Sequence, residues 1–283
     1  MPLRIEKAKV IGFCSGVRRA IDIVEKAARE HGKLETLGAI VHNQPVLDKL
    51  SSIGVSIAGG VDEIKGNLVA TSAHGLSPRI EQEIKARHID IIDTTCPFVH
   101  RAQIAARRLA RAGFFVIVYG DLSHPEVKGV LGWAGSNSLA TLDERAATGL
   151  KPLPHRLGIL SQTTQVPAHF NEFARGLIEH TLSKDSELRI VDTICHDIRK
   201  RQAQALKLAG RVDLMLVIGG HDSANTGRLV QLCSEVTETR LIETAREIQA
   251  SWLKGKGHIG IASGASTAQE TIDEVISRLE LVA

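Results

Sequence analysis

Short apolar runs alternate with longer amphipathic stretches along the whole chain. The runs predict strands at residues 10–13, 34–41, 55–58, 68–72, 89–93, 114–119, 139–142, 157–160, 188–191, 214–218, 240–243 and 259–262. Several are continuous Val, Ile and Leu segments, a pattern typical of strands buried on both faces of a parallel sheet. Residues 17–30, 97–112 and 226–238 instead repeat apolar positions with helical spacing.

Strands that alternate with helices predict βαβ units and therefore an α/β fold. The strand segments divide into three similar modules, each with a mostly parallel sheet. We expect the first module at 1–96 with Cys14 and Cys96, and the second at 97–193 with His124 and Glu126. The third, at 194–283, contains Cys195 and a loop with Ser223 and Asn225.

Composition excludes several classes of protein. Hydrophobic residues make up 43% and charged residues 24% of the 283 positions, an ordinary balance for a globular protein. The net charge of +3 and 3% aromatic residues give no indication of nucleic-acid binding. There is no apolar run of about 18 residues, so no membrane span is expected. The first residues lack the pattern of a signal peptide, and we expect a cytoplasmic protein.

Cysteine, histidine and hydroxyl side chains follow nearly every predicted strand. Ligands of parallel α/β sheets gather beyond the carboxyl ends of the strands. Helix capping accounts for Thr163, Ser223 and Ser266. It does not account for the cysteines and histidines at the same ends, which are Cys14, His42, His74, Cys96, His124 and Cys195.

Three of the four cysteines predict a metal centre. Cys14, Cys96 and Cys195 lie far apart without a C-x-x-C motif, so only the fold can bring them together. Each precedes a predicted helix, whose N-terminus favours a thiolate. Three thiolates fit a 4Fe–4S cluster with one iron open to substrate, and zinc with three Cys and one His is the competing metal. Cys233 lies in the middle of an apolar helical stripe, and we assign it to the core.

Two glycine-rich helix starts predict an anion site. Residues 219–225 and 263–266 each follow a strand, and backbone N–H groups at such positions attract anions. With His42 and His74 they suggest a phosphate or diphosphate. In the segment His124-Pro125-Glu126, proline stiffens the loop, and a carboxylic acid there can deliver a proton if burial raises its pKa. An ordinary turn with a solvated Glu is the alternative interpretation of this segment.

Taken together, the motifs resemble the 4-hydroxy-3-methylbut-2-enyl diphosphate reductase family of the isoprenoid pathway. The matching segments are 12–17, 41–43, 72–75, 95–97, 124–127, 162–164, 192–195 and 264–266. They occur in the family's order and cover essentially the whole chain.

The resemblance implies a trefoil of three α/β modules around a central 4Fe–4S cluster. It implies that Cys14, Cys96 and Cys195 bind the cluster. It also implies a catalytic group and a set of substrate ligands. The catalytic group is Glu126, His124 and Thr163, and the substrate ligands are His42, His74, His124, Ser223, Asn225 and Ser266. The family's reaction is a two-electron reductive dehydroxylation that gives isopentenyl and dimethylallyl diphosphate, with ferredoxin or flavodoxin as the electron donor.

The chain departs from the family pattern after the third cysteine, at His196-Asp197-Ile198, and in the anion loop, at His221-Asp222 and at Ala224. Ala224 replaces the second of two successive serines, and Ile198 replaces a threonine, so two hydroxyls are missing. Each lost donor to a charged oxygen costs about 1.5–3 kcal/mol. A related iron–sulfur enzyme that acts on a different small molecule is therefore one alternative. A non-enzymatic iron–sulfur sensor or electron carrier is another.

Two basic groups are candidates for docking an acidic redox partner. They are Arg18-Arg19 and Arg199-Lys200-Arg201, and a solvated surface is the alternative interpretation for both.

Overall fold

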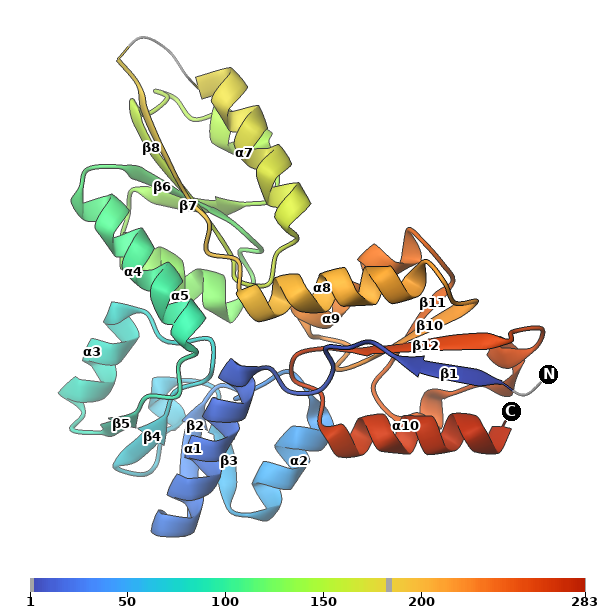
Figure 1. Ribbon diagram of the computed structural model, residues 1–283. Coiled ribbons are helices and arrows are strands. Elements are labelled where there is room, and N and C mark those ends of the chain that lie inside the picture. Colours follow the sequence, from blue (N-terminus) through green and yellow to red (C-terminus); the bar gives the residue numbers. More distant parts are fainter. Residues whose placement is uncertain (1–2, 182–184, 283) are drawn as a thin grey trace. The chain divides into compact units, whose positions relative to one another are not determined.

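A computed structural model describes residues 3–181 and 185–282 of the chain (Figure 1). Twelve strands in this part of the chain form three four-stranded sheets, in which neighbouring strands run parallel. The predicted α/β class with three similar modules is confirmed. The trefoil arrangement and the module boundaries at 96 and 193 stay predictions.

Contacts within the chain define two compact units. The first contains Met1–Arg18, Val41–Ser52 and His196–Ala283. The second contains Arg19–Ile40 and Ile53–Cys195. One sheet therefore belongs to the first unit and two sheets belong to the second.

The sheet of the first unit has the order β1-β12-β10-β11. Its strands are β1 (Arg4–Lys7), β10 (Leu214–Ile218), β11 (Thr239–Ile242) and β12 (His258–Ser263). The helices of this unit are α2 (Gln44–Ser52), α8 (His196–Ala209), α9 (Ala224–Ser234) and α10 (Gln269–Val282), with short 3₁₀ turns η2 (Ala245–Glu247) and η3 (Ala250–Leu253). All five residues of β10 are buried, as expected for a central parallel strand.

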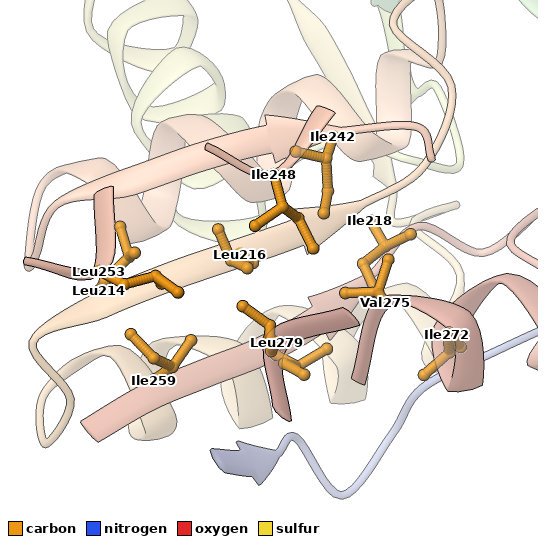
Figure 2. Packing of buried hydrophobic residues seen from close by; sticks show 11 residues of the cluster. Leu214, Leu216, Ile218, Ile242, Ile248, Leu253, Ile259, Ile272, Val275 and Leu279 are labelled. Atoms are coloured by element: carbon orange, nitrogen blue, oxygen red, sulfur yellow. The ribbon is translucent and has the colours of Figure 1, made fainter. Parts of the chain in front are cut away.

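One apolar cluster packs α10 against this sheet. Figure 2 shows Leu216, Ile259, Val275 and Leu279 among its side chains. Burying each such side chain stabilises the fold by about 1.5–3 kcal/mol.

The strand predicted at residues 10–13 is wrong, because the first strand lies earlier, at Arg4–Lys7, and pairs with β12. The apolar run at 10–13 is interrupted by Gly12, whose φ of 80° is in the left-handed region. The Gly12 N–H donates to Ser263 Oγ at 2.9 Å. The run is therefore a turn that leads into α1 (Ser15–His31).

The second unit contains two sheets with the orders β3-β2-β4-β5 and β7-β6-β8-β9. The first has strands β2 (Leu34–Leu37), β3 (Val55–Ala58), β4 (Leu68–Ala70) and β5 (Asp90–Ile92), with η1 (Val61–Glu63) and α3 (Pro78–Ala86). The second has β6 (Phe115–Tyr119), β7 (Ser138–Thr141), β8 (Arg156–Ser161) and β9 (Glu187–Val191). The helices α4 (Pro97–Arg111), α5 (Pro125–Ala134), α6 (Glu144–Thr148) and α7 (Pro167–Thr181) accompany this second sheet.

Different helices cover the two faces of the β7-β6-β8-β9 sheet. On one face, Ala102, Ala106 and Leu109 of α4 pack with Val116 and Val118 of β6. On the other face, side chains of α6 and α7 pack with Ile117 and Ile159 of β6 and β8; they are Ala147, Phe170, Phe173 and Leu177. Helices α4 and α7 therefore lie on opposite sides of one sheet.

Candidate active site

The predicted anion loop forms the start of helix α9 in the first unit. Ser223 is the N-cap of α9, and its Oγ accepts the Thr226 N–H at 3.3 Å. Asn225 is 7% exposed, and its Nδ2 is buried without a hydrogen-bond partner among the described residues. A buried amide donor without a partner is costly, and a ligand oxygen would satisfy it. The loop is therefore suited to bind an anion.

A second loop joins this one at the same end of the sheet. The Gly264 N–H, just past β12, donates to the carbonyl of Ile218 at the end of β10, at 2.7 Å. Ser266 follows and is 7% exposed. The carboxyl ends of two neighbouring parallel strands thus bring Ser223, Asn225 and Ser266 into one region.

His42 belongs to the same group. Ser266 Oγ donates to the His42 carbonyl at 3.4 Å, and a side chain at Gly220 would collide with that carbonyl. Burial lowers the pKa of His42, and the charge of Asp222 opposes this effect. A neutral imidazole still has one N–H donor, and a bound anion would favour its protonated form.

Cys14 directly precedes α1 and is hydrogen-bonded to the loop that contains Ser266. Its N–H donates to the Ala265 carbonyl at 2.9 Å, and its Sγ accepts the Val17 N–H at 3.4 Å. Burial raises the pKa of the Cys14 thiol, whereas the Val17 hydrogen bond and the charge of Arg201 lower it. A bound metal would favour the thiolate outright.

Arg201 is a structural residue that sequence reasoning missed. It is 2% exposed and donates to the carbonyls of Ser263 at 2.8 Å and Gly12 at 2.7 Å, so it ties the Cys14 loop to the end of β12. The expectation that residues 199–201 form a basic docking group is therefore wrong for Arg201. Its position on the buried stripe of α8, between Ile198 and Ala205, is the signal that could have revealed this role.

Asp197 interacts with the start of α1 in the same unit. Its Oδ2 accepts the Ser15 hydroxyl at 2.7 Å, and this hydrogen bond is the main cause that lowers the pKa of the Asp197 carboxyl. The carboxylate is thus committed to a protein donor.

The second unit contains a buried acid at the start of α5. Glu126 is 2% exposed, and its two carboxyl oxygens accept the Thr163 N–H at 2.6 Å and the Thr163 hydroxyl at 2.8 Å. The predicted loop is therefore no ordinary turn with a solvated Glu. His124 caps α5 by accepting the Glu126 N–H on Nδ1 at 3.2 Å, which leaves Nε2 as the protonated nitrogen of the neutral ring.

A continuous run of contacts connects the two cysteines of this unit. The Cys195 N–H donates to the Thr163 carbonyl at 2.9 Å, and Thr163 binds Glu126. His124 then meets His74 edge to face, with ring centroids 5.2 Å apart. The residue before His74 accepts the Cys96 N–H at 3.0 Å. The structure thus brings together all six predicted site residues of this unit, which are His74, Cys96, His124, Glu126, Thr163 and Cys195.

The positions of three cysteines in the elements agree with the sequence analysis. None forms a disulfide. Cys96 is the N-cap residue of α4, and Cys195 directly precedes α8. Cys233 is fully buried in an apolar cluster, and burial raises its pKa to about 11.

Comparison with known proteins identifies the family. The sequence profile of the LytB protein family matches residues 5–280. The chain belongs to this family. LytB relatives include the 4-hydroxy-3-methylbut-2-enyl diphosphate reductase of Dehalococcoides mccartyi strain CBDB1, which is 57% identical over 98% of both chains. The corresponding reductase of Geobacter metallireducens is 39% identical over 98% of this chain and 97% of its own.

Solved LytB-type structures agree with this assignment. The E-1-hydroxy-2-methyl-but-2-enyl-4-diphosphate reductase of Plasmodium falciparum matches with a TM-score of 0.91 and 25% identity, over 98% of this chain and 88% of its own. An (E)-4-hydroxy-3-methyl-but-2-enyl diphosphate reductase, the terminal enzyme of the non-mevalonate pathway, matches with a TM-score of 0.70 and 35% identity over 99% of both chains. Among the described residues of the LytB chain, no helix is both long and apolar enough to span a membrane.

Proposed function

We propose that this chain is a 4-hydroxy-3-methylbut-2-enyl diphosphate reductase. In the reaction, the C–O bond of the allylic hydroxyl breaks, two electrons and two protons enter, and isopentenyl or dimethylallyl diphosphate leaves with water. The observation that supports this function most strongly is the buried Glu126, held by Thr163 on the run of contacts between Cys96 and Cys195. Full-length relatives with this activity in their names support the same proposal.

Cys14, Cys96 and Cys195 fit a 4Fe–4S cluster by their chemistry. Each stands directly before a helix, and the Cys14 sulfur accepts a backbone N–H, a type of hydrogen bond that tunes cluster potentials. Three ligands leave one iron available to the substrate. When bound, the cluster would supply the two electrons and a Lewis-acidic iron for the hydroxyl oxygen.

The first unit would bind the diphosphate. Asn225 has an amide donor that no described residue satisfies, and Ser223 and Ser266 lie at the same end of the sheet. Hydrogen bonds to charged oxygens contribute about 1.5–3 kcal/mol each. His42 would add a donor, and a positive charge once a proton binds.

The second unit would supply the proton for the departing hydroxyl. In its acidic form Glu126 would donate a proton to the departing hydroxyl, which then leaves as water. Thr163 fixes the orientation of the carboxyl group, and His124 and His74 would place N–H donors beside it. Ferredoxin or flavodoxin would deliver the electrons, and the reaction would take place in the cytoplasm.

Turnover under anaerobic conditions tests this proposal. The purified chain, with reduced methyl viologen as donor, should convert the allylic diphosphate to isopentenyl and dimethylallyl diphosphate. Product analysis with Glu126→Gln as the matched inactive variant checks that this carboxyl group is required. An iron-loaded wild-type chain that forms neither product would contradict the proposal.

A reductase of a different small molecule is the second candidate, because of the missing hydroxyl at Ala224. Ala224 is the first residue of α9, directly before Asn225, so the loss falls within the anion loop. Ile198, in contrast, is 3% exposed on the buried face of α8, where an apolar side chain packs well. If the substrate has changed, Ala224→Ser should create or strongly raise turnover of the allylic diphosphate. If the substrate is retained, it should lower KM only a few-fold.

A further inference from the structure

Helix α4 has an unusual charge composition. It contains Arg101, Arg107, Arg108 and Arg111 and no carboxylate. Arg101, Ile104, Arg108 and Arg111 are exposed, and their spacing of three and four residues places them along one side of the helix. We call these four residues the α4 face. The opposite side of α4 packs on the sheet through Ala102, Ala106 and Leu109.

The N-terminal end of the α4 face lies beside both cysteine segments of the second unit. Cys96 is the N-cap of α4. Arg101, little more than one turn later, donates to the carbonyl of Asp192 at 2.7 Å, three residues before Cys195. An electron carrier on this face would therefore lie next to the backbone of two of the three proposed cluster ligands.

Helix stability explains only some of the arginines. Arg108 and Arg111 suit the negative C-terminal end of the helix dipole, but Arg101 lies near the positive end. Within 3–181 and 185–282, no carboxylate pairs with Arg101, Arg108 or Arg111, whereas Arg156 and Arg189 share Glu187. Helix α7, on the other side of the same sheet, has mixed charges with Glu172, Arg175 and Glu179.

An apolar residue lies among these charges. Ile104 is 41% exposed and borders a cavity of about 430 Å³, which His100, Arg107 and Trp133 also line. Weak redox complexes bury little area and depend on charge complementarity around a small apolar centre. The α4 face has this composition.

We propose that the α4 face is the docking surface for a small acidic electron-transfer protein, which supplies the two electrons one at a time. This inference rests on the proposed function, because only a reductase needs such a donor. Arginines without a carboxylate partner attract an acidic protein over a distance and raise its association rate, and salt screens this attraction.

Charge reversal on the two sides of the sheet tests the surface. The test variant is Arg108→Glu/Arg111→Glu on the α4 face. The matched control is Arg145→Glu/Arg175→Glu, which makes the same charge change at exposed positions of α6 and α7. Turnover is measured at low and high salt with methyl viologen, with an acidic ferredoxin and with an acidic flavodoxin, each protein donor reduced enzymatically.

The test variant should need at least about tenfold more protein donor for half-maximal turnover at low salt. It should lose the salt dependence and keep the wild-type rate with viologen, whereas the control should behave as wild type with every donor. Equal behaviour of both variants with the protein donors would overturn the docking surface. So would a wild-type chain that turns over with viologen and accepts electrons from neither acidic protein. Failure of viologen-driven turnover in the wild type would count against the proposed function itself.

Discussion

The two units contain polar groups that differ in how far the protein itself satisfies them. In the first unit, the Asn225 amide is buried without a described partner, and burial lowers the pKa of the His42 ring. In the second unit, Thr163 holds both oxygens of the Glu126 carboxyl group. A buried N–H donor without a partner favours binding of an oxygen ligand. A carboxyl group that the protein already holds in place is oriented before any ligand binds. The contrast supports the proposed roles, which are anion binding in the first unit and proton transfer in the second.

The cysteines should show the largest effect, because they test the proposed metal centre. Cys14→Ala in the first unit, and Cys96→Ala or Cys195→Ala in the second, should each lose bound iron and reduce turnover to the assay background. Cys233→Ala should keep both, since this thiol is a core residue whose pKa is raised to about 11. Iron content after anaerobic purification checks these outcomes. Retained iron in Cys14→Ala would exclude Cys14 from the proposed cluster ligands.

Glu126→Gln should have the next largest effect and act on kcat. Removing a general acid typically costs about 10²–10⁴-fold in rate. Affinity for the substrate should change little, because the amide keeps the shape of the side chain. Thr163→Val removes one hydrogen bond and should reduce kcat less. Steady-state kinetics distinguish these cases. A near-wild-type kcat for Glu126→Gln would contradict the proposal that Glu126 donates the proton.

Asn225→Ala should act on binding instead. Loss of a donor to a charged oxygen should raise KM and the inhibition constant of inorganic diphosphate by about ten- to a hundredfold. The kcat should stay close to wild type. Asn171→Ala, at an exposed position of α7, is the control and should change neither constant. A variant in which kcat falls while KM is unchanged would contradict the division of roles.

His42 should give the smallest effect, a pH dependence of anion binding. Its pKa lies below the ordinary 6.5 in the folded chain, so the unfolded chain takes up a proton first and stability falls as pH drops through that value. A bound anion favours the protonated ring, so diphosphate affinity should rise several-fold as pH falls toward the lowered pKa of His42 in the folded chain. Diphosphate affinity is measured by calorimetry for wild type and His42→Gln at the same pH values. The protonation of diphosphate itself affects both proteins equally and therefore cancels in the comparison. An identical pH dependence in both proteins would exclude His42 from the anion group.

Much of the fold was predictable because central strands such as β6, β8, β10 and β12 are buried on both faces. Continuous apolar runs such as Leu214–Ile218 and Phe115–Tyr119 predicted strands at those positions. The run at 10–13 failed because hydropathy does not report backbone conformation, and Gly12 adopts a positive φ there. The region of the candidate site residues was also predictable. Ligands of a parallel sheet gather beyond the carboxyl ends of its strands, and the direction of the chain alone identifies those ends.

Hydrogen-bond partners and long-range pairing were less predictable. Arg201 was grouped with basic surface residues, although its donors bind Ser263 and Gly12, which are distant in sequence. The hydrogen bond from Thr163 to Glu126 likewise joins two loops of different βα units. Such pairs depend on tertiary packing, which periodicity within one segment does not describe.

Mössbauer spectroscopy of the anaerobically purified, iron-57-loaded chain tests the central claim most directly. Spectra are recorded with and without the allylic diphosphate, on wild type and on Asn225→Ala. We predict a 4Fe–4S cluster with one distinct iron whose signal shifts when the diphosphate binds, at a higher ligand concentration in the variant. A spectrum typical of four equivalent cysteine ligands, unchanged by the diphosphate, would contradict the account.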